Sequence, residues 1–155
     1  MCSDLKQDIL DSIEDIGDLL ASYESLFKTV KQRAPDNIEL AAMGTILHSF
    51  YTGVEGVFLL VSKQIDKTTP DDSSWHQSLL KQMMAATEER AYLISPESAS
   101  LLAPYLKFRH FFRHAYAFML DWSRLKPLAD DLISVWGTDR EDIATFCVTH
   151  ASFTP

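Results

Sequence analysis

The side chains best suited to chemistry are concentrated between residues 109 and 116. Two arginines, two histidines and a tyrosine fall within this short segment: Arg109, His110, Arg113, His114 and Tyr116. A guanidinium offers a planar fork of donors that matches phosphate oxygens, and imidazole has the ordinary pKa that lies nearest neutrality. The combination predicts a site that binds phosphate and moves protons.

Charge is distributed unevenly around this segment. The chain has 14 basic and 22 acidic residues and a net charge of −8, which argues against non-specific binding of nucleic acid. Residues 101–126 are the exception, because Asp121 is their only acid. Their basic residues are Lys107, Arg109, Arg113, Arg124 and Lys126. A local basic patch is what a phosphate polymer requires, so we expect such a ligand to be confined to a groove here.

Length and composition indicate a globular protein. A chain of 155 residues is long enough to bury a core, and we expect residues 1–155 to form a single domain. Cys2 and Cys147 lie far apart and outside any CxxC pair, which predicts neither a disulfide framework nor a cysteine-based metal site. We see no secretory signal and no apolar run near the roughly 20 residues of a membrane span, so we expect a cytoplasmic protein without a membrane partner.

Helical periodicity dominates the first half of the chain. One helix is predicted over residues 5–31, with an apolar seam at steps of four and three. The seam consists of Ile9, Ile13, Ile16, Leu20, Tyr23, Phe27 and Val30. A second helix is predicted over residues 36–65, capped by Asp36, with Ile38 on its buried face. Within it, His48 and Glu55 could be functional, but we favour an interpretation as partly satisfied polar groups of a bundle.

Shorter sequence signals predict several separate elements in the second half of the chain. A helix is predicted from Trp75 to about residue 88, followed by a connector over residues 90–94. Ser95 and Pro96 open a fourth helix, which Pro104 should kink or split. The last helix should begin at residue 123 or 124, with Pro127 in its first turn, Ile133 on its apolar side and Gly137 as a candidate interruption. Residues 151–155 should be loose. Without any strand pattern, this predicts an all-α, antiparallel bundle of four to five helices.

The motif residues do not share one helical face. At about 100° per residue, Arg109, Arg113 and Tyr116 lie together, whereas His110 and His114 form another face. His114 is then about 140° round from Arg109, so a straight helix does not direct both at one point. Either the helix is distorted, or a second copy of the chain supplies the other half across a two-fold interface, which is the arrangement we favour.

The spacing of Arg109, His114 and Tyr116 forms an R-x4-H-x-Y motif, with the polar His110 directly after the arginine. It resembles the motif of the HEPN superfamily of nucleotide-associated helical domains. The chain is more closely similar to the HepT-like toxins that are paired with minimal nucleotidyltransferase antitoxins. Two long helices, the segment Tyr-Thr-Gly-Val-Glu-Gly at residues 51–56 and the late position of the motif extend the resemblance over most of the chain.

The resemblance implies a homodimeric toxin of a type VII-like toxin–antitoxin system, which cleaves RNA without a metal or another cofactor. Arg109 and His114 would be catalytic: His114 as general acid or base at the ribose 2′-hydroxyl, and Arg109 against charge on the phosphorane-like transition state. The product would carry a 2′,3′-cyclic phosphate. His110 would hold phosphate or orient the others. Tyr116 would receive AMP from the cognate nucleotidyltransferase, which silences the toxin.

Arg113 is not part of the family motif, and only its chemistry suggests a further phosphate contact. The acidic net charge favours small RNA substrates or single-stranded ends, with transfer RNA and messenger RNA both open as targets and no role for DNA.

Two structural interpretations stand beside these roles. The phenylalanines of the segment are expected in the core or a dimer interface rather than as platforms for bases. They are Phe108, Phe111, Phe112 and Phe118. His110 and His114 could be two metal ligands on one helix face, although a third ligand is missing nearby.

A second functional class also remains open. The whole chain could be a catalytically inactive helical dimer that binds a nucleotide or a protein partner.

Overall fold

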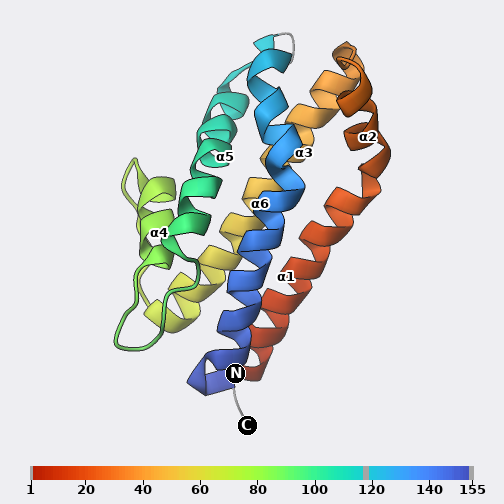
Figure 1. Ribbon diagram of the computed structural model, residues 1–155. Coiled ribbons are helices and arrows are strands. Elements are labelled where there is room, and N and C mark those ends of the chain that lie inside the picture. The colour runs from red at the N-terminus through yellow and green to blue at the C-terminus, as the bar shows by residue number, and fades with distance from the viewer. Residues whose placement is uncertain (1, 117–118, 154–155) are drawn as a thin grey trace.

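The computed structural model describes residues 2–116 and 119–153, and in these residues every regular element is a helix. The elements in chain order are α1 (Cys2–Ser22), α2 (Glu24–Gln32), α3 (Asn37–Val61), η1 (Ser62–Asp66), α4 (Trp75–Met84), α5 (Pro96–His114), α6 (Trp122–Thr149) and η3 (Ala151–Phe153). The long helices α1, α3, α5 and α6 run alternately up and down, and the short α4 lies beside α5 (Figure 1). The structure confirms an all-α helical bundle.

The predicted seam of the first helix is buried, except at Tyr23, which is 39% exposed. The chain breaks there into α1 and α2, so the prediction of one helix over residues 5–31 is wrong. Tyr23 leaves helical geometry with φ −113° and ψ 20°. Just before it, the Ser22 hydroxyl donates to the carbonyl of Asp18, a local bond that competes with the backbone ladder. The break allows α2 to turn Phe27 and Val30 into the core.

Helix α3 is the central element of the core. Asp36 caps it as predicted, in a capping box with Glu39. Ile38 was expected on the buried face but is 82% exposed, because it lies in the first turn and points away from the bundle. The α-helical part ends at Val61, and residues 62–66 continue as the π-helical turn η1 instead of more α-helix.

The combined helix from Asn37 to Asp66 is long and apolar enough to cross a membrane by length and composition. This corrects the expectation that no segment approaches that length. Side chains such as Phe50, Val54 and Phe58 are completely buried against the other helices, which makes this the core helix of the bundle.

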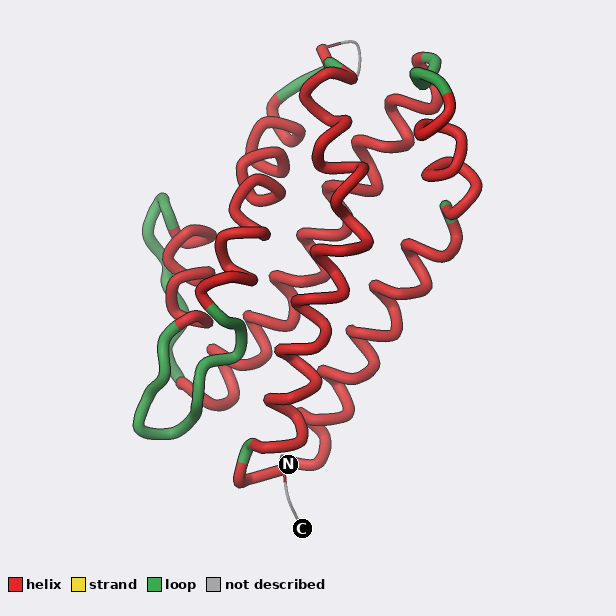
Figure 2. The backbone as a smooth tube through the Cα atoms, in the orientation of Figure 1, coloured by secondary structure: helices red, strands yellow, loops and turns green. Residues whose placement is uncertain are grey.

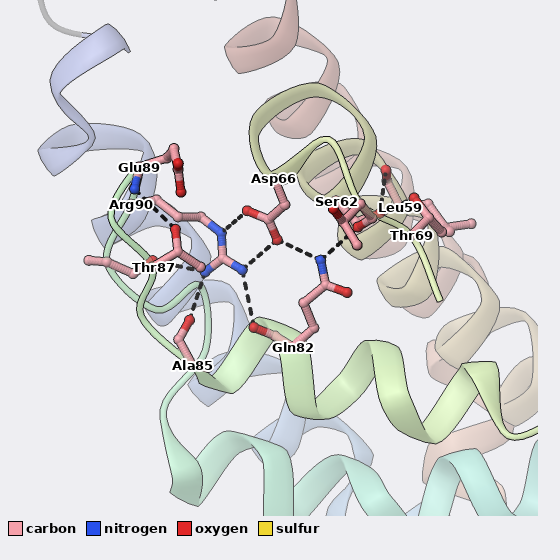
Figure 3. Close-up of polar contacts among 11 residues, drawn as sticks. Leu59, Ser62, Asp66, Thr69, Gln82, Ala85, Thr87, Glu89 and Arg90 are labelled. Carbon is pink, nitrogen blue, oxygen red and sulfur yellow. Dashed lines mark hydrogen bonds and ion pairs between the residues drawn. The ribbon is translucent and has the colours of Figure 1, made fainter. Parts of the chain in front are cut away.

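A buried ion pair joins the loop after α4 to η1, which continues α3 (Figure 3). The Arg90 guanidinium donates from Nε to Oδ1 of Asp66 at 2.6 Å and from Nη2 to Oδ2 at 2.7 Å. The side-chain amide of Gln82 in α4 donates a hydrogen bond to the same carboxylate, and the backbone carbonyl of Gln82 accepts one from Arg90. The non-helical stretches that flank α4, residues 67–74 and 85–95, are thereby held in place (Figure 2). Helix α4 ends at Met84, earlier than predicted.

Helix α5 begins as predicted, with Ser95 as its cap and Pro96 at its start. Asp142 of α6 accepts hydrogen bonds from the Ser95 backbone and the Ser98 hydroxyl, so the start of α5 is also tied to α6. Helix α5 continues through Pro104, so of the two predicted outcomes, a kink or a split, the split is wrong. Ser100, whose carbonyl loses its usual partner, is exposed together with Pro104, so water can satisfy that carbonyl.

Helix α6 is one helix from Trp122 to Thr149, capped by Asp121, and it starts slightly before the predicted residue. Pro127 therefore lies in the second turn and not in the first. The exposed Gly137 does not interrupt the helix. Ile133, predicted on the apolar side, is 55% exposed.

The C-terminal tail is more ordered than expected as far as Phe153. Residues 151–153 form η3, and the Phe153 ring is buried against Phe146 and His150. Residues 154–155 lie outside the described residues.

Candidate functional site

A cavity of about 840 Å³ lies between α4 and α5. Among the described residues that line it, no side chain is acidic and seven are basic or histidine. These seven are His76, Lys81, Lys107, Arg109, His110, Arg113 and His114. Lys107, Arg109 and Arg113 of the predicted basic patch line this cavity, and residues from α4 extend it, whereas Arg124 and Lys126 do not line it.

Arg109 and His114 reach the same cavity within a single chain. The sequence analysis expected a distorted helix or a second copy of the chain to bring them together. Both residues line the cavity because it extends along α5 from Ala103 to His114. The homodimer stays a prediction.

Arg109 is held from behind by α3. Its side chain is almost buried, with Nε donating to the Thr52 hydroxyl at 3.2 Å and Nη2 lying 3.9 Å from Oε1 of Glu55. Thr52 and Glu55 are one turn apart, so they face α5 side by side. The guanidinium is thereby fixed at the cavity wall, which is what a group that must meet a phosphate at a set position requires.

Glu55 has a second partner that the sequence analysis missed. Its side chain is only 4% exposed, and Oε2 lies 2.7 Å from Nδ1 of His76, the second residue of α4. A buried carboxylate in an apolar helix needs a charged or hydrogen-bonding partner, and that requirement was the signal available in the sequence. It could not identify the partner, because His76 approaches only through tertiary packing. Glu55 is thus satisfied, as predicted, but by residues of the cavity itself.

The other motif residues of α5 are exposed at the cavity. His110 and His114 lie one turn apart, as predicted, with ring centroids 5.1 Å apart in an edge-to-face arrangement. Arg113 is also exposed, in contrast to the nearly buried Arg109. His110, Arg113 and His114 thus provide three exposed hydrogen-bond donors beside the fixed guanidinium of Arg109.

Tyr116 does not share a helical face with Arg109, because α5 ends at His114. Ala115 is extended, with φ −113° and ψ 151°, and it redirects the chain. Tyr116 is 72% exposed and does not line the cavity. Its side chain thus lies at the surface of the bundle, outside the cavity.

The aromatic residues of the segment have different environments. Phe108 is buried and Phe112 is half-buried, which agrees with a packing role, whereas Phe111 is 41% exposed. Phe118 lies outside the described residues.

His48 of α3 lies behind the motif with its ring centroid 5.2 Å from that of Phe112. Its Nε2 is buried and has no hydrogen-bond partner among residues 2–116 and 119–153. Burial, and then the charges of Arg109 and Arg113, lower the pKa of His48. An unsatisfied Nε2 agrees with the prediction that His48 is a partly satisfied polar group of the bundle.

In the part of the chain that the structure describes, no three residues of the types His, Cys, Asp and Glu are grouped closely enough to hold a metal ion. His110 and His114 therefore form a pair without a third ligand of these types there.

The family model described as "HepT-like protein" matches residues 42–150, well over half of the chain. The chain belongs to this HepT-like family of the HEPN superfamily. No curated protein and no solved structure gives a significant match. Family membership associates the chain in general with HEPN ribonucleases of toxin–antitoxin systems.

Proposed function

We propose that this chain is the toxin of a type VII-like toxin–antitoxin pair and acts as a metal-independent endoribonuclease. The observation that carries the proposal is the cavity between α4 and α5, where a fixed guanidinium and several histidines meet without an acidic lining residue. An acidic protein gains little from so positive a cavity unless an anion occupies it. In a HepT-like protein, RNA is the anion that fits.

In the proposed reaction, the RNA phosphate lies against Arg109, and His114 removes the proton of the neighbouring ribose 2′-hydroxyl. The 2′-oxygen attacks phosphorus, the bond to the 5′-oxygen breaks, and a 2′,3′-cyclic phosphate and a 5′-hydroxyl end are formed. Arg109 offsets the negative charge that develops on the phosphorane-like transition state. His110 and Arg113 hold adjacent phosphate oxygens, for which their exposure at the cavity suits them.

We place a second copy of the chain at an apolar groove beside this cavity. The groove, of about 830 Å³, lies between α5 and the start of α6 and is lined by the exposed Phe111 and Met119 together with Leu128. Lys107 lines both the groove and the cavity, so a partner seated in the groove would lie next to the RNA. Burial of this surface would favour association.

Silencing is proposed to act on Tyr116. The cognate nucleotidyltransferase would transfer AMP to its exposed hydroxyl, two residues beyond His114. The adenylyl group adds a negative charge and bulk near the cationic cavity, where it would compete with RNA phosphate.

The direct test is cleavage of cellular RNA by the purified chain in excess EDTA, with wild type, His114→Ala and His150→Ala compared. His150 stacks on Phe146 outside the cavity and serves as a matched control. We expect wild type and His150→Ala to leave cyclic phosphate ends and His114→Ala to leave the RNA intact. The same samples are weighed by mass spectrometry to detect AMP on Tyr116. An unmodified wild-type chain without activity would refute the ribonuclease and favour the inactive binding module.

A further inference from the structure

The imidazole of His76 is positioned by two contacts that leave one of its nitrogens for a ligand. Nδ1 is bound to Oε2 of Glu55 at 2.7 Å. A carboxylate only accepts hydrogen bonds, so in this pair Nδ1 carries the proton and Nε2 is the nitrogen left for exchange. The neighbouring Trp75 stacks on the ring, with centroids 3.6 Å apart. His76 lines the cavity with 22% of its side chain exposed, so Nε2, the nitrogen that Glu55 does not occupy, is the one left for a ligand there.

We propose that His76 is the general acid of this site and protonates the 5′-oxygen that leaves when the RNA chain is cut. The proposal rests on the ribonuclease function proposed above. Nothing in the motif of α5 requires it, because His76 belongs to α4 and lines the cavity from that helix.

The placement of the two histidines on different helices favours this division of roles. In-line displacement puts the attacking 2′-oxygen and the leaving 5′-oxygen on opposite sides of phosphorus, so two proton-transferring groups on opposite sides serve it best. His114 lies on α5 and His76 on α4, and these helices form the two walls of the cavity. His110 shares the wall and the helical face of His114, which makes it less suited to the second role.

Glu55 connects the proposed acid to the phosphate-binding arginine. One carboxylate oxygen contacts His76 and the other faces Arg109, so a single buried side chain sets the spacing between them. The arrangement explains why an acid is kept in the apolar helix α3 directly behind a cationic cavity. The same contact can stabilise the imidazolium of His76 once it is protonated.

Two protons are transferred in the proposed cleavage step. His114 accepts the proton of the 2′-hydroxyl as the 2′-oxygen bonds to phosphorus. Nε2 of His76 gives its proton to the 5′-oxygen as the bond between phosphorus and that oxygen breaks. The products are the cyclic phosphate and the 5′-hydroxyl, with His114 protonated and His76 neutral. Transfer of protons through water restores both, and no oxidant or second reactant is consumed.

The test compares an RNA oligomer that wild type cleaves with the same oligomer carrying sulfur in place of the 5′-oxygen at the cleaved bond. A thiolate leaves without protonation, so a variant that lacks only the general acid should recover on the sulfur substrate. The variant is His76→Asn, whose amide can still donate to Glu55 from the position of Nδ1 but has nothing at Nε2. His150→Asn is the control, since that histidine lies outside the cavity.

We expect His76→Asn to cut the ordinary oligomer about 10²-fold or more slowly and the sulfur oligomer within a few-fold of wild type. His114→Ala should be slow on both, and His150→Asn should match wild type on both. Because each rate ratio compares two substrates for one variant, partial unfolding would lower both rates and leave the ratio unchanged. His76→Gln, with its amide near the position of Nε2, should behave as His76→Asn does.

Equal losses on the two oligomers would overturn the general-acid role and leave His76 a positioning residue. Normal rates for both His76 variants on the ordinary oligomer would show that the histidine only satisfies Glu55. If the unmodified wild-type chain cleaves no RNA, the ribonuclease itself is rejected, which is a distinguishable result because it is reached before any variant is compared.

Discussion

The carboxylate of Glu55 and the guanidinium of Arg109 form an ion pair inside the protein, with Oε1 and Nη2 3.9 Å apart. The pair joins α3 to α5 at the wall of the cationic cavity. Arg109 is therefore a structural partner of a buried acid as well as the phosphate ligand that we propose, and substitutions should separate these two roles.

Arg109→Ala should lower the free energy of unfolding by about 1–3 kcal/mol, because the buried Glu55 then loses one of its two side-chain partners and keeps His76. The measurement is urea denaturation followed by circular dichroism. In a double-mutant cycle with Glu55→Gln, the loss should shrink, since the amide no longer needs the cation. His114→Ala, at an exposed position, should change stability by less than about 0.5 kcal/mol while abolishing cleavage. Additive losses in the cycle would contradict the pair.

Tyr116→Phe should escape addition of AMP by the partner nucleotidyltransferase, because the variant has no hydroxyl to accept it. Intact-mass measurement after incubation with ATP and the partner enzyme reports the modification directly. Tyr92→Phe is the matched control, since Tyr92 is also exposed, at 49%, and lies on another loop. Full modification and silencing of Tyr116→Phe would reject the proposed switch.

Asp139 should make the protein less stable as the pH rises. It is fully buried in α6, and neither carboxylate oxygen has a hydrogen-bond partner within the described residues. Burial, and then the charge of Asp142, raise the pKa of Asp139 to about 8 from its ordinary 3.8. The folded state thus binds an extra proton between these values. The stability that this proton confers is complete below pH 3.8 and is lost as the pH rises through about 8.

The measurement is the difference in unfolding free energy between wild type and Asp139→Asn across this pH range. A difference removes the contribution of groups common to both proteins. We expect wild type to lose up to about 1.4 kcal/mol per pH unit relative to the variant. Parallel pH profiles would show that Asp139 titrates normally.

Gly44 should be intolerant of a side chain. A Cβ at this position of α3 would lie 2.9 Å from Cε2 of Phe112 and 2.9 Å from Cδ1 of Leu120. Gly44→Ala should therefore destabilise by about 1–3 kcal/mol and disturb the end of α5 that carries the motif. Gly137→Ala is the counterpart, because a Cβ there meets nothing within 4 Å. It should stabilise the exposed helix by about 0.5–1 kcal/mol, and thermal unfolding measures both variants.

Sequence periodicity determined the helices and most of their buried faces. Ile9, Ile16 and Leu20 are buried as their spacing predicts, because a helix repeats every 3.6 residues wherever it forms. Exposure of Tyr23 and Ile38 followed from where neighbouring helices stop, which spacing along one helix does not encode. The continuous passage of α5 through Pro104 depended likewise on solvent exposure of that turn.

For the candidate site as well, the sequence determined some features and the tertiary structure determined others. Arg109, His110, Arg113 and His114 are visible in the sequence because they lie close together along one helix and their chemistry is a property of their side chains. The cavity, the link from Arg109 through Glu55 to His76, and the placement of Tyr116 beyond the end of α5 were decided by tertiary structure. Contacts between α3, α4 and α5 join residues far apart in the chain, and only packing of the helices sets those distances.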